Sequence, residues 1–97
     1  MAGQIRITPD EMRSRAVDYT SRREELTTLI SNLDTLLATL REEWEGSASE
    51  QFDSQWQEIK PGFNNCEQLL DTITAQLNQT AQAMESLDAE IASQMGV

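Results

Sequence analysis

A chain of 97 residues forms one domain at most, and a domain of that size buries too little surface to be strongly stable by itself. Apolar residues make up 38% of it, and it holds four Gly and two Pro, which favours an ordered helical protein over a disordered one. The net charge of −10 repels other polyanions, so we expect neither DNA nor RNA as a partner.

The chain also lacks the segments that direct a protein through the general export route. Its first twelve residues contain no uninterrupted apolar run, and no later stretch approaches the roughly 18 apolar residues of a membrane span. By that route the protein is expected to stay in the cytoplasm. The single Cys66 cannot form an internal disulfide, and we interpret it as a small buried apolar residue, with a symmetric intermolecular disulfide as the alternative.

Residue types that carry catalysis and metal binding are scarce. The chain has no His and one Cys, which removes the imidazole base and the usual zinc ligand sets. Glu42, Glu43 and Glu45 cluster before a glycine but lack the spacing of a calcium loop. We therefore predict no catalytic residue, no metal ligand and no cofactor.

The first helix is predicted at about residues 9–44. Thr8 and Glu11 form a capping-box pattern, with Pro9 at the first helical position. Apolar residues then recur at alternating spacings of four and three, which is typical of one face of a helix. With Arg23 as its one polar member, this stripe comprises Met12, Ala16, Tyr19, Arg23, Leu26, Ile30, Leu33, Leu37, Leu40 and Trp44.

A tight turn at 44–47 precedes a longer second helix at about residues 48–94. Gly46 can adopt the backbone conformation that ends a helix, and the run from Ser47 to Glu50 predicts a second capping box. The four-three alternation then resumes and persists almost to the end of the chain. Its members are Phe52, Trp56, Ile59, Phe63, Cys66, Leu70, Ile73, Leu77, Thr80, Met84, Leu87 and Ile91, with Met95 further on.

Pro61 interrupts the second helical pattern. A proline removes one helical hydrogen bond and crowds the preceding turn, at a cost of about 3 kcal/mol. The apolar phase is nevertheless kept from Ile59 to Phe63, so a kink near Pro61 is favoured over a break.

Because the connection is short, the two helices are expected to run antiparallel, with Leu40 level with Phe52 and Leu26 level with Cys66. The same level places basic and acidic side chains across from each other. Arg22 and Arg23 on the first helix are expected beside Glu67, Leu70 and Asp71 on the second, so the two arginines face the carboxylates of Glu67 and Asp71.

A lone hairpin buries too little apolar surface to offset the entropy of ordering its chain. Leu29, Leu36 and Leu69 widen the stripes, so a second hairpin can cover them. The predicted fold is all-α: an antiparallel two-helix hairpin that spans residues 1–97 and dimerises into an elongated four-helix bundle. The partner is a second copy in an antiparallel homodimer or, alternatively, a related hairpin. The predicted core comprises Leu26, Leu29, Ile30, Leu33, Leu36, Leu37, Leu40, Phe52, Trp56, Ile59, Phe63, Cys66, Leu69, Leu70, Ile73 and Leu77.

The turn between the two helices carries the sequence Trp44-Glu45-Gly46. In a chain of this length, and over essentially all of it, this arrangement resembles the WXG family of small type VII (ESX) secretion substrates, the early secretory antigenic target-like proteins. The resemblance implies a hairpin that dimerises and leaves the cytoplasm folded, without a cleavable signal peptide, through a membrane ATPase machine of Gram-positive bacteria.

That family also places an export signal, Tyr-x-x-x-Asp/Glu, near the end of the second helix. Here the matching place holds Met84 and Asp88, with Met instead of Tyr, followed in helical phase by Ile91 and Met95. The resemblance therefore implies that Trp44 and Gly46 of one chain and the segment from Met84 to Met95 of its partner form a composite signal for the secretion ATPase.

Three functions remain open at this stage. The first is a secreted dimeric protein that acts by protein contact, as an effector or as a component for co-export of others. The second is a secreted virulence factor that perturbs membranes through its amphipathic helices, which the acidic charge opposes at neutral pH. The third is a cytosolic structural coiled coil unrelated to secretion.

Overall fold

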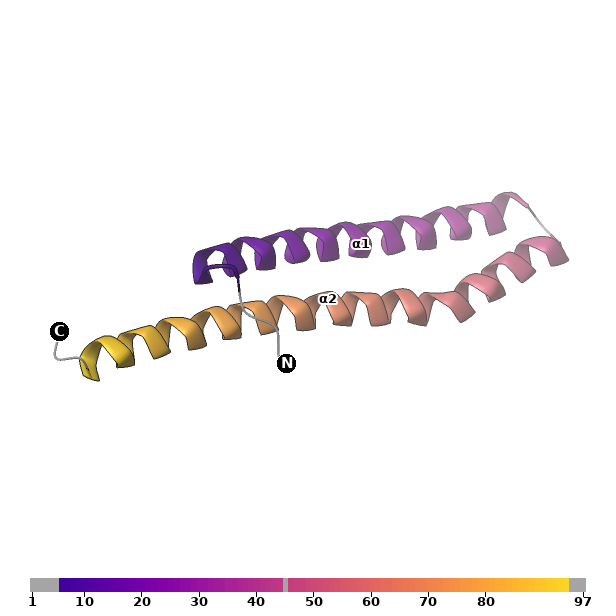
Figure 1. The fold of residues 1–97 in the computed structure, drawn as a ribbon. Coiled ribbons are helices and arrows are strands. Elements are labelled where there is room, and N and C mark those ends of the chain that lie inside the picture. Colours follow the sequence, from indigo (N-terminus) through magenta and orange to yellow (C-terminus); the bar gives the residue numbers. More distant parts are fainter. Residues whose placement is uncertain (1–5, 45, 95–97) are drawn as a thin grey trace.

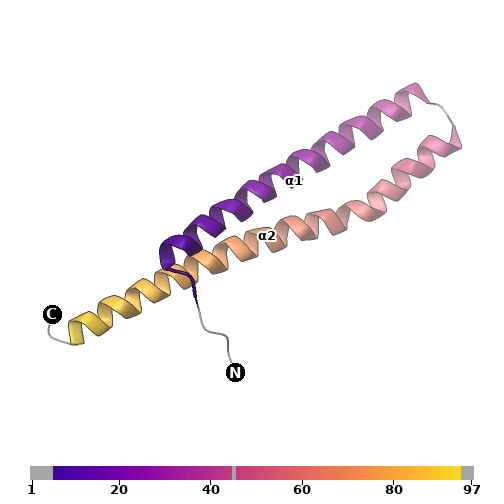
Figure 2. The same cartoon turned by 45° about the horizontal axis from the view of Figure 1, so that its top comes forward.

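The computed structural model describes residues 6–44 and 46–94. Helix α1 (Pro9–Glu43) and helix α2 (Ser47–Gln94) run antiparallel, side by side, and α2 extends past the start of α1 (Figures 1 and 2). The molecule measures 76 × 25 × 16 Å. The predicted all-α hairpin is confirmed, and it is a rod because its two helices have only each other to pack against.

The start of α1 is held by the predicted capping box. The Glu11 amide donates to Thr8 Oγ1 at 3.1 Å, and the Thr8 amide donates to Glu11 Oε1 at 3.4 Å. Pro9 occupies the first helical turn, where its missing N–H leaves no hydrogen bond unmade. These local contacts determine where α1 begins.

The start of α2 differs from the prediction. Ser47 is itself the first helical residue, and the Gly46 carbonyl accepts from the Glu50 amide at 3.4 Å. The hydroxyl of the buried Ser49 donates to the same carbonyl at 3.3 Å. The predicted capping box with Ser47 as its first member is therefore wrong, because the chain enters the helix at Gly46, one residue earlier.

Pro61 lies inside α2, which continues through it as a single helix. The axis of α2 changes direction in the pink segment around this residue (Figures 1 and 2). Trp56 and Phe63, on either side of Pro61, pack with ring centroids 5.7 Å apart.

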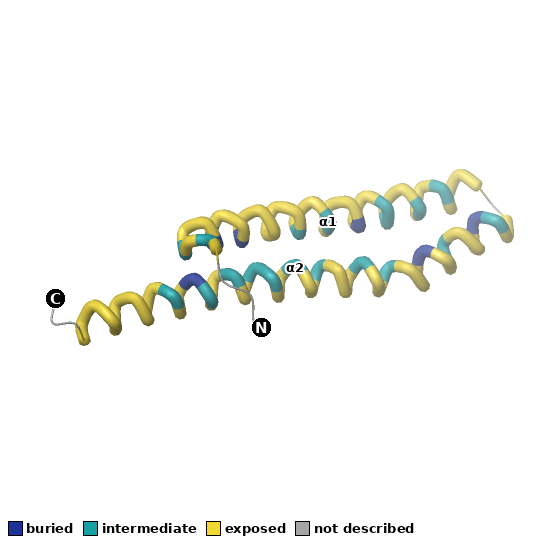
Figure 3. Tube along the Cα trace, in the orientation of Figure 1, coloured by how far each residue is buried: buried dark blue, intermediate teal, exposed yellow. Residues whose placement is uncertain are grey.

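Little of the apolar surface is buried by one hairpin. Within the described residues, the buried apolar side chains are Met12, Ala16, Ile30, Trp56 and Ala81. They lie along the line where α1 faces α2, and most of the remaining surface of both helices is exposed (Figure 3). The large apolar side chains that stay exposed are Val17, Tyr19, Leu29, Leu36, Trp44, Phe52, Ile59, Leu69, Leu87 and Ile91.

Ion pairs between α1 and α2 form close to the positions along the rod that the antiparallel arrangement predicts. Arg23 lies 3.1 Å from Asp71 and 3.7 Å from Glu67, as expected from the antiparallel arrangement. Arg22 does not take part, because its guanidinium turns along α1 and binds Glu25 at 2.7 Å. The prediction that Arg22 contacts α2 is therefore wrong.

Cys66 is exposed in the hairpin. It lies on a flank of α2 that turns away from the line of contact with α1, so no part of α1 covers it. The prediction of a buried Cys66 is wrong for a single hairpin, which leaves this flank open.

Candidate functional site

The turn is the first candidate site. Trp44 follows the last residue of α1, and its backbone amide donates to the Leu40 carbonyl at 2.8 Å. The indole packs edge to face against Phe52, with ring centroids 5.9 Å apart, yet remains 46% exposed. This geometry holds Trp44 in a defined position at the tip of the rod while leaving much of its surface available to another protein.

Gly46 gives the turn its shape. Its φ of +142° lies in a region that residues with a Cβ rarely adopt. No heavy atom lies within 4 Å of the position that a Cβ would take, so backbone conformation, rather than space, requires glycine here. Arg41 and Asp53 form an ion pair of 3.3 Å across the same end, which ties α1 to α2 beside the turn.

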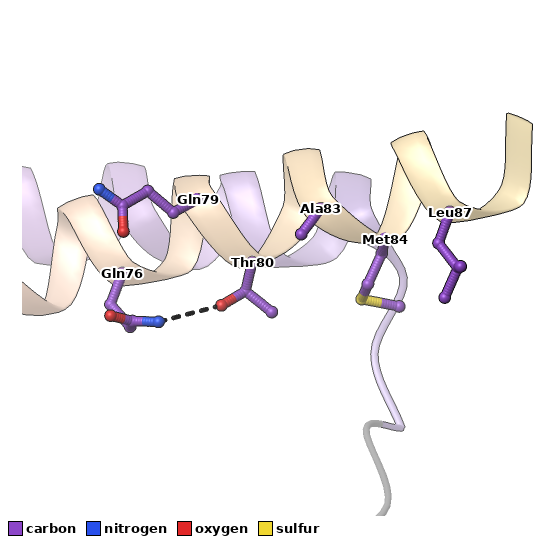
Figure 4. Close-up of a pocket in the computed structure, with 6 residues that line it drawn as sticks. All are labelled: Gln76, Gln79, Thr80, Ala83, Met84 and Leu87. Atoms are coloured by element: carbon purple, nitrogen blue, oxygen red, sulfur yellow. Dashed lines mark hydrogen bonds between the residues drawn. The ribbon is translucent and has the colours of Figure 1, made fainter. Parts of the chain in front are cut away.

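The second candidate site is the end of α2. Met84 lines a shallow, mostly apolar groove of about 390 Å³ together with Gln76, Gln79, Thr80, Ala83 and Leu87 (Figure 4). Asp88 and Ile91 follow on exposed positions of the same helix, whereas Met95 lies outside the described residues. The groove is open to solvent, so its apolar lining can accept side chains of another chain.

Glu85 fixes this end of α2 to α1. Its carboxylate accepts hydrogen bonds from both Nη atoms of the Arg13 guanidinium, and the distance from Nη1 to Oε2 is 2.8 Å. The hydrogen bonds from Arg13 lower the pKa of Glu85 from its ordinary value. The segment after Glu85 then projects beyond α1 (Figure 1).

The two predicted halves of the export signal lie at opposite ends of one hairpin. Trp44 and Gly46 are at the turn, whereas Met84 is next to Glu85, which binds Arg13 in the second turn of α1. The start of α1 lies at the end of the hairpin opposite the turn (Figures 1 and 2). A single chain therefore does not bring them together.

Sequence reasoning missed a polar cluster in the middle of the hairpin. Asp34 of α1 accepts hydrogen bonds from Trp56 Nε1 and Lys60 Nζ of α2, both at 2.7 Å. The bond from Lys60, followed by that from Trp56, lowers the pKa of Asp34 from its ordinary value. Because the helices run antiparallel, Asp34 lies opposite the turn of α2 that contains Trp56 and Lys60. Counting residues outward from the turn between the helices, which paired Arg23 with Asp71, could therefore have predicted this contact.

No group of His, Cys, Asp or Glu side chains suited to a metal ion occurs in the described part of the chain. Neither α1 nor α2, over the residues that the structure describes, has a stretch apolar enough to cross a membrane. The geometry offers surfaces for protein contact: an exposed aromatic turn, an apolar groove and an apolar flank.

An elongated two-helix hairpin with a Trp-x-Gly turn and several large exposed apolar side chains places the chain in a class of small helical hairpin proteins. The chain belongs to the WXG100 family, described as proteins of 100 residues with WXG, whose pattern matches residues 4–89. It is 39% identical to the protein YukE of Bacillus subtilis (strain 168) over 95 residues, which cover 98% of each chain. It is 29% identical to the type VII secretion system extracellular protein A of Staphylococcus aureus (strain USA300), covering 96% of each chain.

Solved structures show the same hairpin. The crystal structure of EsxA from Geobacillus thermodenitrificans matches with a TM-score of 0.85 and 41% identity, covering 95% of this chain and 99% of that one. The secreted protein EsxB of Bacillus anthracis (strain Sterne) matches with a TM-score of 0.80, covering 90% of this chain and 99% of that one. At 22% identity, the second match supports the fold alone.

Proposed function

We propose that this chain is a substrate of a type VII secretion system in a Gram-positive bacterium, exported as a folded antiparallel homodimer that acts through protein contacts. Membership of the WXG100 family and a relative named as an extracellular protein of that system support export. The partner is a second copy of the chain, because two copies related by a two-fold axis cover each other's exposed apolar flank.

The observation that carries the dimer is the exposed apolar flank. Leu29 and Leu36 are 50% and 64% exposed, and Ile59 and Leu69 are 55% and 57% exposed. A monomer in water rarely exposes so many large apolar side chains on one face. In an antiparallel pair of hairpins this flank becomes the centre of a four-helix bundle.

Dimerisation also unites the two ends of the signal. When two hairpins pack antiparallel, the turn of each lies toward the start of α1 of the other, where the groove around Met84 is located. The Trp44 turn of one chain and the partner's Met84, Asp88, Ile91 and Met95 then form one surface at each end of the rod. We propose that the secretion ATPase binds this composite surface.

The dimer is tested by light scattering on the purified protein across a dilution series. A mass near twice 10.9 kDa at working concentration, falling only on strong dilution, is the expected result. A helical monomer at all concentrations would contradict the homodimer and point to another chain as the partner.

The signal is tested by measuring secretion from a bacterium that carries the machine. Trp44→Ala is expected to stay dimeric and to lose at least about nine-tenths of its export, since aromatic anchors dominate binding energy. Phe52→Ala is the matched control, because it removes the same edge-to-face contact but keeps the indole. A dimeric Trp44→Ala that is exported at the wild-type level would contradict the role of the turn.

The groove is tested in the same assay. Met84→Glu places a charge in the apolar lining and is expected to reduce export strongly. Gln82→Glu adds the same charge at an exposed position outside the groove and is expected to have little effect. Equal export of both variants would remove the groove from the signal.

A further inference from the structure

Arg13 and Glu85 join the two helices at the end where α2 leaves α1. In the part of the chain that the structure describes, Ala81 is the last buried residue of α2, and Glu85 is the last whose side chain bonds to α1. The two Nη atoms of Arg13 donate to the two carboxylate oxygens of Glu85, so the pair is bidentate. Because two hydrogen bonds hold both planar groups, such a pair fixes direction as well as distance.

The nine residues of α2 that follow are not packed against α1. All residues from Ser86 to Gln94 are exposed, and they project past the start of α1 (Figure 1). An isolated helix shorter than about 12 residues is marginal in water. The last turn of α2 also has no basic residue to offset the negative end of the helix dipole. The direction of this segment therefore depends on how α2 is held where it leaves α1.

We propose that Arg13 is a positioning residue for export: by holding Glu85 it fixes the direction in which the end of α2 presents Leu87, Asp88 and Ile91 to the secretion ATPase. This inference rests on the function proposed above. It assigns to export a residue of α1 that lies outside both candidate sites and acts only through α2.

The ion pair lies on the flank of the hairpin away from the one that the proposed dimer covers. Arg13 is sixteen residues from Leu29 on α1, and Glu85 is sixteen residues from Leu69 on α2. At about 100° per residue, each is roughly 160° around its helix from that exposed leucine. Changes to the pair therefore leave the apolar flank intact, so their effect on export can be separated from dimerisation.

Charge reversal in a secretion assay tests the role of Arg13. Arg13→Glu and Glu85→Arg each replace an attraction by a repulsion, and export of each is expected to fall about fivefold. The double variant Arg13→Glu/Glu85→Arg restores the ion pair in reverse and is expected to recover at least half of wild-type export. Light scattering is expected to give the same dimer mass for all three. A double variant as defective as Glu85→Arg would show that Glu85 acts directly, and would overturn the role of Arg13.

Arg23→Gln is the matched control for Arg13→Gln, because each variant removes an ion pair between α1 and α2 without adding a charge. Arg23 binds Glu67 and Asp71 far from the end of α2. Its loss is expected to lower the melting temperature at least as much as Arg13→Gln does, yet to leave export at the wild-type level. Equal loss of export in the two variants would show a general effect of stability and would overturn the positioning role.

Hydrogen exchange measured by mass spectrometry observes the segment directly in the purified protein. In Arg13→Gln, the amides of residues 82–94 are expected to exchange several-fold faster than in the wild type, whereas those of residues 56–72 are expected to be unchanged. In Arg23→Gln the two regions are expected to behave the other way round. Unchanged exchange over residues 82–94 in Arg13→Gln would overturn the inference.

Failure of this inference differs from failure of the proposed function. A wild type that stays inside cells in which the secretion machine is active would overturn both. A wild type whose export falls with Trp44→Ala and Met84→Glu, but not with Arg13→Gln or Arg13→Glu, would overturn the positioning role alone.

Discussion

Asp34 of α1 and Trp56 of α2 are joined by a hydrogen bond of 2.7 Å from the indole Nε1 to a carboxylate oxygen, and Lys60 donates to the other oxygen. Trp56 is buried, so its N–H needs an acceptor from within the hairpin. The carboxylate thereby links two turns of α2 to α1 immediately before Pro61.

Removing the Asp34 carboxylate is expected to destabilise the hairpin. Asp34→Ala leaves the Trp56 N–H without this acceptor, and we expect the melting temperature to fall by about 5 °C. Thr39→Ala, an exposed position on the same helix, is the control and is expected to change little. If Trp56→Phe lowers stability equally in the wild type and in Asp34→Ala, the two side chains are not coupled and the interpretation is wrong.

Acid is expected to remove the contribution of Asp34. Its pKa is lowered in the folded state, mainly by the hydrogen bond from Lys60 and then by that from Trp56. A lowered pKa means that the stabilisation is fully present above the unfolded value of about 3.9 and is lost as the pH falls through the folded value. The melting temperature of Asp34→Asn should therefore lie below that of the wild type at neutral pH and approach it in acid. A gap that stays constant down to about pH 2.5 would contradict this.

Gly46→Ala is expected to destabilise the turn by about 1–3 kcal/mol, because its φ of +142° is strained for any residue with a Cβ. Gly62→Ala is the matched control, since it adds the same methyl group inside α2 with nothing within 4 Å. Ala has the higher helix propensity, so this variant should be as helical as the wild type or slightly more so. Denaturant unfolding measures both, and equal destabilisation would show that backbone conformation is not the cause.

The Cys66 thiol should report dimerisation. It is exposed in the single hairpin and lines a groove together with Ile59, which belongs to the apolar flank that the proposed dimer covers. Its rate of reaction with a thiol reagent is therefore expected to be high in dilute, monomeric protein and to fall several-fold as dimers form. A reaction rate that does not change over the concentrations at which light scattering shows dimers would contradict the burial of Cys66 by the partner.

The sequence by itself determined the hairpin, since its signals are local. Thr8 and Glu11 satisfy each other's backbone groups at the start of α1, and Gly46 supplies the positive φ that the turn needs. The alternation of four and three residues fixed which face of each helix is apolar, and the short connection fixed the antiparallel direction. These features also located the Trp44 turn, which carried the family resemblance.

Only the tertiary structure decided which residues of each apolar helix face are buried between α1 and α2 and which stay exposed. Cys66 belongs to the same stripe as buried Trp56, yet it is exposed, because two helices cover a narrower strip than the stripe is wide. The tertiary structure also decided that the Arg22 guanidinium turns along α1 to Glu25 and away from α2. Such choices depend on distances between segments far apart in the sequence, which periodicity along one helix does not contain.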